Sequence, residues 1–278
     1  MTSNLSTKAS STDTIRQVAV LAATIATVAY NGYSQVAKVG GNTSADISNK
    51  YFTYFTPANY AFSIWGIIYT LMFAFAIYQV LPSQRTNPNT RKVAVPYMIT
   101  CVLNCVWITV FQFDQIAISM GLIVLFLAAL VVIYVRLGIG FTAVSAVERL
   151  TLHLPFSVYT AWLCVATIAN ASALGVSLNP GLGAINNSAS FLGIASPTWA
   201  AIMLVVATLV GAIIAFTRRD IGFVAVFVWA FTAIISKQAG VTVVTTTAGI
   251  TSAVLVIVLA AGLVIKMRRP QPLAPARA

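Results

Sequence analysis

The chain has 278 residues, of which 59% are hydrophobic and only 8% are charged. Soluble domains carry about 25% charged residues, so this composition excludes an ordinary soluble protein and places the chain in a lipid bilayer. Lys and Arg outnumber Asp and Glu by 16 to 5, which gives a net charge of +11. We expect these cations to lie in short loops beside apolar spans rather than to bind nucleic acid.

The chain opens on residues 1–14, which are polar and rich in Ser and Thr and lack the pattern of a secretory signal. We expect a disordered tail there, followed by helices that each need about 20 apolar residues to cross about 30 Å of hydrocarbon. Eight candidate spans follow, at residues 16–37, 59–81, 93–113, 115–136, 152–176, 197–217, 221–237 and 246–267. The sequence therefore predicts an all-α, polytopic membrane protein with about eight transmembrane helices.

The positions of the cations test this count. With eight crossings, 13 of the 16 Lys and Arg residues fall on one face of the membrane, and only Lys38, Lys50 and Lys237 fall on the other. Cations accumulate on the cytoplasmic side of short loops. The pattern therefore predicts that both termini are cytoplasmic and that the uncharged loop 178–196 lies on the outer side.

The sequence offers no recognisable catalytic set. It has no Ser/His/Asp set, no paired carboxylates and no phosphate-binding Gly loop, and no charged residue lies near the middle of a span. The cysteines, Cys101, Cys105 and Cys164, lie in apolar runs and predict neither disulfides nor a metal site. His153, at the start of the fifth span, could be an axial haem ligand, but a lone interfacial His is more often a hydrogen-bonded anchor.

Aromatic and amide side chains recur on four of the first five spans at spacings of three and four residues. Positions three and seven residues apart lie within about 60° of one another on a helix. The sets are Thr24, Thr27 and Asn31; Phe62, Trp65 and Tyr69; Asn104, Trp107 and Phe111; and Tyr159, Trp162, Ala166 and Asn170. Amides in hydrocarbon need partners, so these faces should point inward. They can line a pocket for a planar apolar ligand or join helix to helix.

Three of these sets carry a resemblance. The runs LNCVWITVF (103–111) and VYTAWLCVATIAN (158–170) resemble the third and fifth helices of the TspO/MBR family, the tryptophan-rich sensory proteins related to the peripheral benzodiazepine receptor. The run TPANYAFSIWGIIYTLMFA (56–74) is similar to the second helix, although Thr56 replaces one proline. Val158 also stands where the fifth helix usually has proline. The resemblance covers a five-helix core, residues 15–177, and the chain looks like the longer, eight-helix branch.

The resemblance implies an integral membrane protein that binds tetrapyrroles such as porphyrin or haem, or other apolar molecules, between the five helices and under the first outer loop. Sensing and transport are both attributed to the family, so a facilitative or exchange transporter of a neutral or amphipathic solute is the alternative. An enzyme or a structural subunit is a third class. Membrane lipid and a second copy in a homodimer are the expected partners. The expected ligand-binding residues are Trp65, Tyr69, Asn104, Trp107, Phe111, Tyr159, Trp162 and Asn170.

The last three spans, within residues 197–267, lie outside the resemblance. Ala207, Gly211 and Ala215 recur at four-residue spacing, a pattern that lets helix backbones approach closely. Trp199 and Trp229 are expected to anchor the helices at membrane interfaces. After Arg268 the Pro-rich and Ala-rich tail, residues 268–278, is expected to be disordered.

Overall fold

The computed structural model of the protein describes residues 10–179 and 190–268. Eight long helices occupy the positions of the eight expected spans within this part of the chain. They are α1 (Ser11–Ala37), α3 (Ile64–Val80), α4 (Pro88–Gln112), α5 (Ile116–Arg136), α7 (Leu154–Leu178), α8 (Ser196–Thr217), α9 (Ile221–Lys237) and α10 (Thr242–Arg268). The prediction of an all-α, polytopic membrane protein is confirmed.

Shorter elements connect these helices. They are the 3₁₀ turns η1 (Val39–Gly41), η2 (Asn59–Ser63) and η3 (Pro82–Gln84), the helices α2 (Ser44–Lys50) and α6 (Ala146–Glu148), the π-helical turn η4 (Arg149–His153), and the strands β1 (Ser190–Phe191) and β2 (Ile194–Ala195). The two strands form a two-residue antiparallel ladder before α8. Asp114, in the left-handed region at φ +64°, makes the tight turn that separates α4 from α5.

Six of the long helices have the length and apolar composition of a membrane span; two of these six, α3 and α7, are counted together with the short turns before them. α9 is a shorter apolar helix. α1 lies outside this set, although it has 27 residues. One face of α1 is polar and buried, with Gln17, Thr24 and Asn31 directed into the protein. These side chains bond to other protein groups, so a helix with a polar stripe can still span the bilayer.

α1 begins earlier than expected, which corrects the predicted boundary of the disordered tail. Residues 11–14 are helical because the Asp13 carboxylate accepts the backbone N–H of Ser10, 3.1 Å away, at the first turn. The same carboxylate accepts two hydrogen bonds from the Arg91 guanidinium, at 2.8 and 2.5 Å, a strong bidentate pair. The rest of the expected tails, residues 1–9 and 269–278, and residues 180–189 of the uncharged loop lie outside the described residues.

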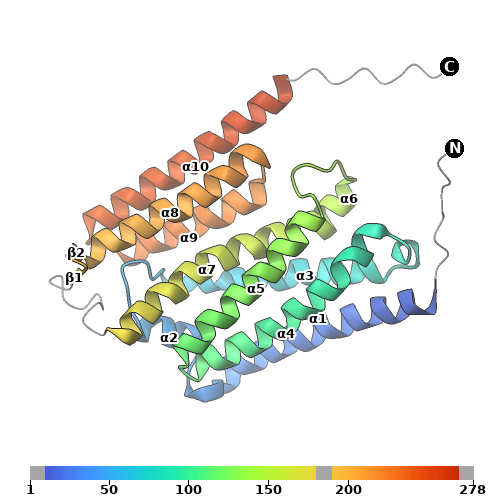
Figure 1. The fold of residues 1–278 in the computed structure, drawn as a ribbon, viewed down its shortest axis with the longest axis horizontal. Helices are drawn as coiled ribbons and strands as arrows, with labels where there is room; N and C mark the ends of the chain where they lie inside the picture. The colour runs from blue at the N-terminus through green and yellow to red at the C-terminus, as the bar shows by residue number, and fades with distance from the viewer. Residues whose placement is uncertain (1–9, 180–189, 269–278) are drawn as a thin grey trace.

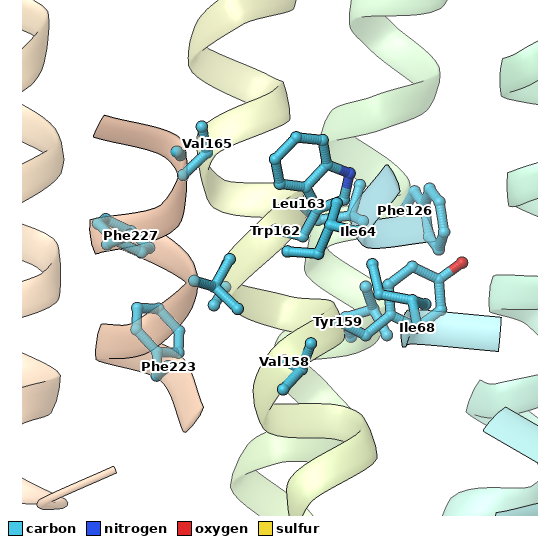
Figure 2. Close-up of a cluster of buried hydrophobic side chains, with 14 of the residues drawn as sticks. Ile64, Ile68, Phe126, Val158, Tyr159, Trp162, Leu163, Val165, Phe223 and Phe227 are labelled. Carbon is cyan, nitrogen blue, oxygen red and sulfur yellow. The ribbon is translucent and has the colours of Figure 1, made fainter. Parts of the chain in front are cut away.

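The helices form two groups that meet at α7. α4 packs against α1 and α5, α5 packs against α7, and α3 lies between α1 and α7. α8, α9 and α10 form the second group, and α9 lies against α7 (Figure 1). In Figure 2, Tyr159 and Trp162 of α7 point toward Ile68 and Phe126, whereas Val165 lies on the side of α9. α7 is therefore buried from both sides.

The small residues of α8 let it approach α10 closely, as predicted. A Cβ atom built on Gly211 would lie 2.8 Å from a methyl carbon of Leu255 on α10 and 3.3 Å from the Phe227 ring on α9. Ala207 and Ala215, one turn to either side, are fully buried. Close backbone approach of this kind replaces the hydrophobic effect as a source of helix association inside a bilayer.

Hydrogen bonds sort the loops into two ends of the bundle. At one end, Arg16 of α1 donates to the carbonyl of Arg85 at 2.8 Å, and Arg218, just after α8, donates to the carbonyl of Ile139 at 2.9 Å. At the other end, the Lys50 ammonium bonds to the Asp114 carboxylate that follows α4. These connections between helices therefore lie at the ends of the bundle where eight alternating membrane crossings would place them.

Candidate functional site

Trp65 lies at the centre of the aromatic residues expected to form the site. Its ring stacks on Tyr69 one turn along α3, with centroids 5.6 Å apart and planes 27° apart. It also contacts three rings from two other helices: Trp107 of α4 at 6.3 Å, and Tyr159 and Trp162 of α7 at 5.9 and 6.4 Å. The aromatic faces of α3, α4 and α7 therefore do point inward, toward one another.

A cavity of about 60 Å³ lies on one side of this cluster. Five of the eight expected site residues line it: Trp65, Trp107, Phe111, Trp162 and Asn170. Phe111 stacks on Trp107 with centroids 5.4 Å apart, which extends the aromatic wall along α4. We call this space the aromatic cavity. Tyr69, Asn104 and Tyr159 are not among its lining residues.

Asn104 and Tyr159 instead join three helices through buried hydrogen bonds. Asn31 of α1 donates its amide to the side-chain oxygen of Asn104, 2.5 Å away, and Asn104 donates to the Tyr159 hydroxyl of α7 at 2.8 Å. Asn104 is fully buried. The structure therefore supports the second interpretation for Asn104 and Tyr159, in which polar side chains join one helix to another.

Asn170 combines both roles. It lines the aromatic cavity, and its amide nitrogen and oxygen each lie 3.3 Å from the Ser119 hydroxyl of α5. The pairing holds the Asn170 amide in place.

Two polar groups on the cavity wall have no partner. The indole nitrogens of Trp107 and Trp162 are buried and have no hydrogen-bond partner among the described residues. The two side chains are only 6% and 3% exposed. Buried donors are almost always bonded, and leaving one unpaired costs about 1–3 kcal/mol. Two of the tryptophans that line the aromatic cavity therefore carry an N–H donor that the described residues leave unpaired.

The loop between α1 and α3 forms the roof of the aromatic cavity, and we call it the first loop. The roof consists of Ser44, Ser48, Tyr51, Phe55, Thr56 and Pro57. Its helix, α2, begins with a capping box in which Thr43 and Asp46 bond reciprocally. Hydrogen bonds from the backbone and hydroxyl of Thr43 hold the pKa of the Asp46 carboxyl below its ordinary value. Gly40 precedes α2 at φ +75°, where a Cβ would lie 2.7 Å from the carbonyl oxygen of Gln112.

α9 supplies a further wall, which corrects the expectation of a pocket between five helices only. Ala230 and Ile234 of α9 line the aromatic cavity. The backbone N–H of Ala58, directly after the roof residue Pro57, donates to the carbonyl of Ala233, 3.0 Å away. No motif in the sequence marks these residues, because an apolar helix carries no signal of which neighbour it contacts.

Trp229 also contacts the first loop and is more than an interface anchor. Its indole donates to the carbonyl of Ala61 at 3.3 Å, and its ring packs edge-on against Tyr60 with centroids 5.3 Å apart. An aromatic ring from α9 thus lies against the first loop.

His153 lies away from the aromatic cavity. It precedes Trp162 by nine residues on a continuous helical path, roughly 14 Å at about 1.5 Å per residue. Its side chain is buried, with Nε2 unpartnered among the described residues, and it is not a lining residue. A molecule in the aromatic cavity would not be coordinated by this imidazole.

The fold and the cavity define the class of protein: a helical membrane protein with an aromatic cavity beneath the loop between its first two long helices. A sequence model of the family described as TSPO-like protein matches residues 17–261. The chain belongs to this family. The match continues through α8 and α9 and into α10, so the last three helices are part of it. Searches of curated proteins and of solved structures gave no match.

Proposed function

We propose that this protein binds a tetrapyrrole, such as protoporphyrin or haem, or another planar apolar molecule with hydrogen-bond acceptors, in the aromatic cavity. The observation that carries the proposal is that two tryptophans lining the cavity, Trp107 of α4 and Trp162 of α7, have buried indole N–H groups with no partner among the described residues. A ligand carbonyl or carboxylate would satisfy these donors. The surrounding rings supply stacking surface.

The size of the cavity indicates how binding would proceed. Ligand pockets usually measure about 300–1,000 Å³, whereas the aromatic cavity measures about 60 Å³, which holds only a few water molecules. A macrocycle would need the roof to lift. Because the roof is bonded to α9, the C-terminal helices would take part in opening the site.

The proposed orientation places both termini in the cytoplasm. Arg16, Arg85 and Arg218 lie at the same end of the bundle as the start of α1 and the end of α10 (Figure 1). Cations favour the cytoplasmic side, so the roof and the aromatic cavity would lie toward the outer side. Ligands would then arrive from the outer leaflet or from the space beyond it.

The proposal is tested by titrating the full-length protein in lipid nanodiscs with protoporphyrin and with haem. Trp107→Phe and Trp162→Phe keep a ring and remove the N–H group. Each should weaken binding by about two- to tenfold, because a neutral hydrogen bond contributes about 0.5–1.5 kcal/mol. Trp199→Phe, outside the aromatic cavity, is the matched control and should bind normally.

Unchanged affinity in both cavity variants would overturn the proposal. Flux of labelled porphyrin across proteoliposomes containing the protein separates binding from transport. If Trp107→Phe and Trp162→Phe lower the porphyrin flux by the same factor as they lower the affinity, the result would favour a facilitative transporter over a sensor.

A further inference from the structure

A second cavity lies between α7 and α8 and is not used by the proposed function. Its volume is about 320 Å³, within the range of small-molecule pockets and larger than the aromatic cavity. The end of α7, the first turns of α8 and residues 53–55 of the first loop form its walls. We call it the α7/α8 cavity.

The α7/α8 cavity exists because two helices meet loosely where small residues face each other. α8 packs mainly on α10 and α9 and touches α7 only lightly. Gly175 on α7 and Ala200 on α8 lie on opposite walls. Gly175 has no side chain and Ala200 carries only a methyl group, and Met203 and Val176 line the gap without filling it.

The lining has the chemistry of a hydrocarbon site with a polar mouth. None of the described residues that line it is charged, and most are apolar. The polar residues Asn179 and Ser196 lie where α7 ends and α8 begins, beside the ring of Trp199. Aromatic and polar groups at this level of a membrane protein mark the interface with lipid headgroups.

The rim of the α7/α8 cavity faces the lipid. Leu178 lines the cavity and is also 75% exposed. Val205 and Leu209, further along α8, are exposed as well. In a chain that spans the bilayer, exposed apolar side chains of this kind contact hydrocarbon. A lipid chain can therefore reach the cavity sideways from the membrane.

We propose that the α7/α8 cavity binds one acyl chain of a phospholipid, with the headgroup near Asn179 and Ser196. The proposal is independent of the proposed function, since Trp107 and Trp162 do not line this cavity. Phe55 is the one side chain that the described linings of both cavities share, and it is only 1% exposed. An acyl chain would rest against the ring that also closes the aromatic cavity.

The test uses the full-length protein in nanodiscs with a phosphatidylcholine that carries a photoreactive diazirine on its acyl chain. After irradiation, peptide mass spectrometry should find label at Met203 and Val176, measured relative to the lipid-facing Leu209. Ala200→Phe fills the cavity and should abolish this label. Val205→Phe adds the same ring on the lipid-facing side of α8 and should leave the label unchanged.

The proposal would be overturned if Met203 is still labelled in Ala200→Phe, or if the label at Met203 never exceeds the label at Leu209. If Ala200→Phe does not fold, Ala200→Leu provides the same comparison with a smaller change. Competition with free palmitate distinguishes a fatty acid from a phospholipid, because displacement at low palmitate would assign the site to the free acid. Protoporphyrin affinity, measured in parallel, reports separately on the aromatic cavity.

Discussion

Gln238, just after the end of α9, donates its side-chain amide to the backbone carbonyl of Thr56 in the roof, 3.1 Å away. The same amide lies 3.3 Å from the carbonyl of Thr53 and is almost completely buried. One side chain from the C-terminal helices thus satisfies two backbone acceptors of the first loop. The position of the roof over the aromatic cavity therefore depends on α9.

Gln238→Leu should loosen the roof, because it leaves two loop carbonyls without their amide partner. Hydrogen exchange of residues 53–58 should become faster, and porphyrin should associate and dissociate faster in stopped-flow measurements. Gln84→Leu, at the opposite end of the bundle, is the control and should change neither. Unaltered exchange in the roof would mean that the Gln238 bonds contribute nothing to its closure.

Removal of α8 to α10 should abolish porphyrin binding. A chain that ends near Asn179 lacks the wall residues Ala230 and Ile234 and loses the Ala58 to Ala233 hydrogen bond. Titration of the shortened and full-length proteins in the same nanodiscs measures the difference. A shortened protein that inserts, survives purification and binds with full affinity would restore the five-helix site as the correct description.

Asn104→Leu should reduce stability more than it reduces ligand affinity. The substitution removes one of the two hydrogen bonds of the Asn31 amide, which keeps its bond to the Thr27 carbonyl, and it leaves the Tyr159 hydroxyl without its donor in the bundle interior. A buried polar group that loses its partner costs about 1–3 kcal/mol. Thermal unfolding in detergent should show a clear decrease in Tm. Tyr159→Phe, which removes only the acceptor hydroxyl, should have a smaller effect. An affinity loss that exceeds the loss from Trp107→Phe would instead assign Asn104 to the ligand site.

Gly211→Val should separate α8 from α10. The added carbons would meet Leu255 and Phe227 at distances that require displacement, and overpacking costs about 1–3 kcal/mol. Gly249→Val on α10 is the matched control, because a Cβ there meets nothing within 4 Å. Detergent-induced unfolding, monitored by near-UV circular dichroism, should show that Gly211→Val is less stable than Gly249→Val. Equal stability of the two variants would contradict the close contact between α8 and α10.

Single-cysteine labelling tests the orientation in a background without Cys101, Cys105 and Cys164. Ser83→Cys and Phe113→Cys place exposed thiols in connections at opposite ends of the bundle. A membrane-impermeant maleimide added outside should label the cysteine at 113 and not the one at 83. The reverse pattern would place the termini on the outer side.

The sequence by itself determined the number and approximate limits of the helices and the direction of their aromatic faces. In hydrocarbon every backbone group must bond within its own helix, so local composition is enough to locate a span. The residues three and four positions from Trp65, Trp107 and Trp162 on their own helices were enough to predict that these faces point inward, because the amides on such faces need partners inside the bundle. The Ser10 and Asp13 cap that starts α1 was also present in the sequence but lies inside the segment interpreted as a tail.

Only the tertiary structure decided which of these residues line a cavity and which join helices. Asn104 and Trp107 lie three residues apart on one face, yet Asn104 bonds to Asn31 and Tyr159, whereas Trp107 faces the cavity. The placement of α9 against α7 and the roof was likewise absent from the sequence pattern. Apolar helix faces are alike in hydropathy, and their partners inside a bilayer are selected by side-chain shape and by a few hydrogen bonds, which become specific only when the whole bundle is assembled.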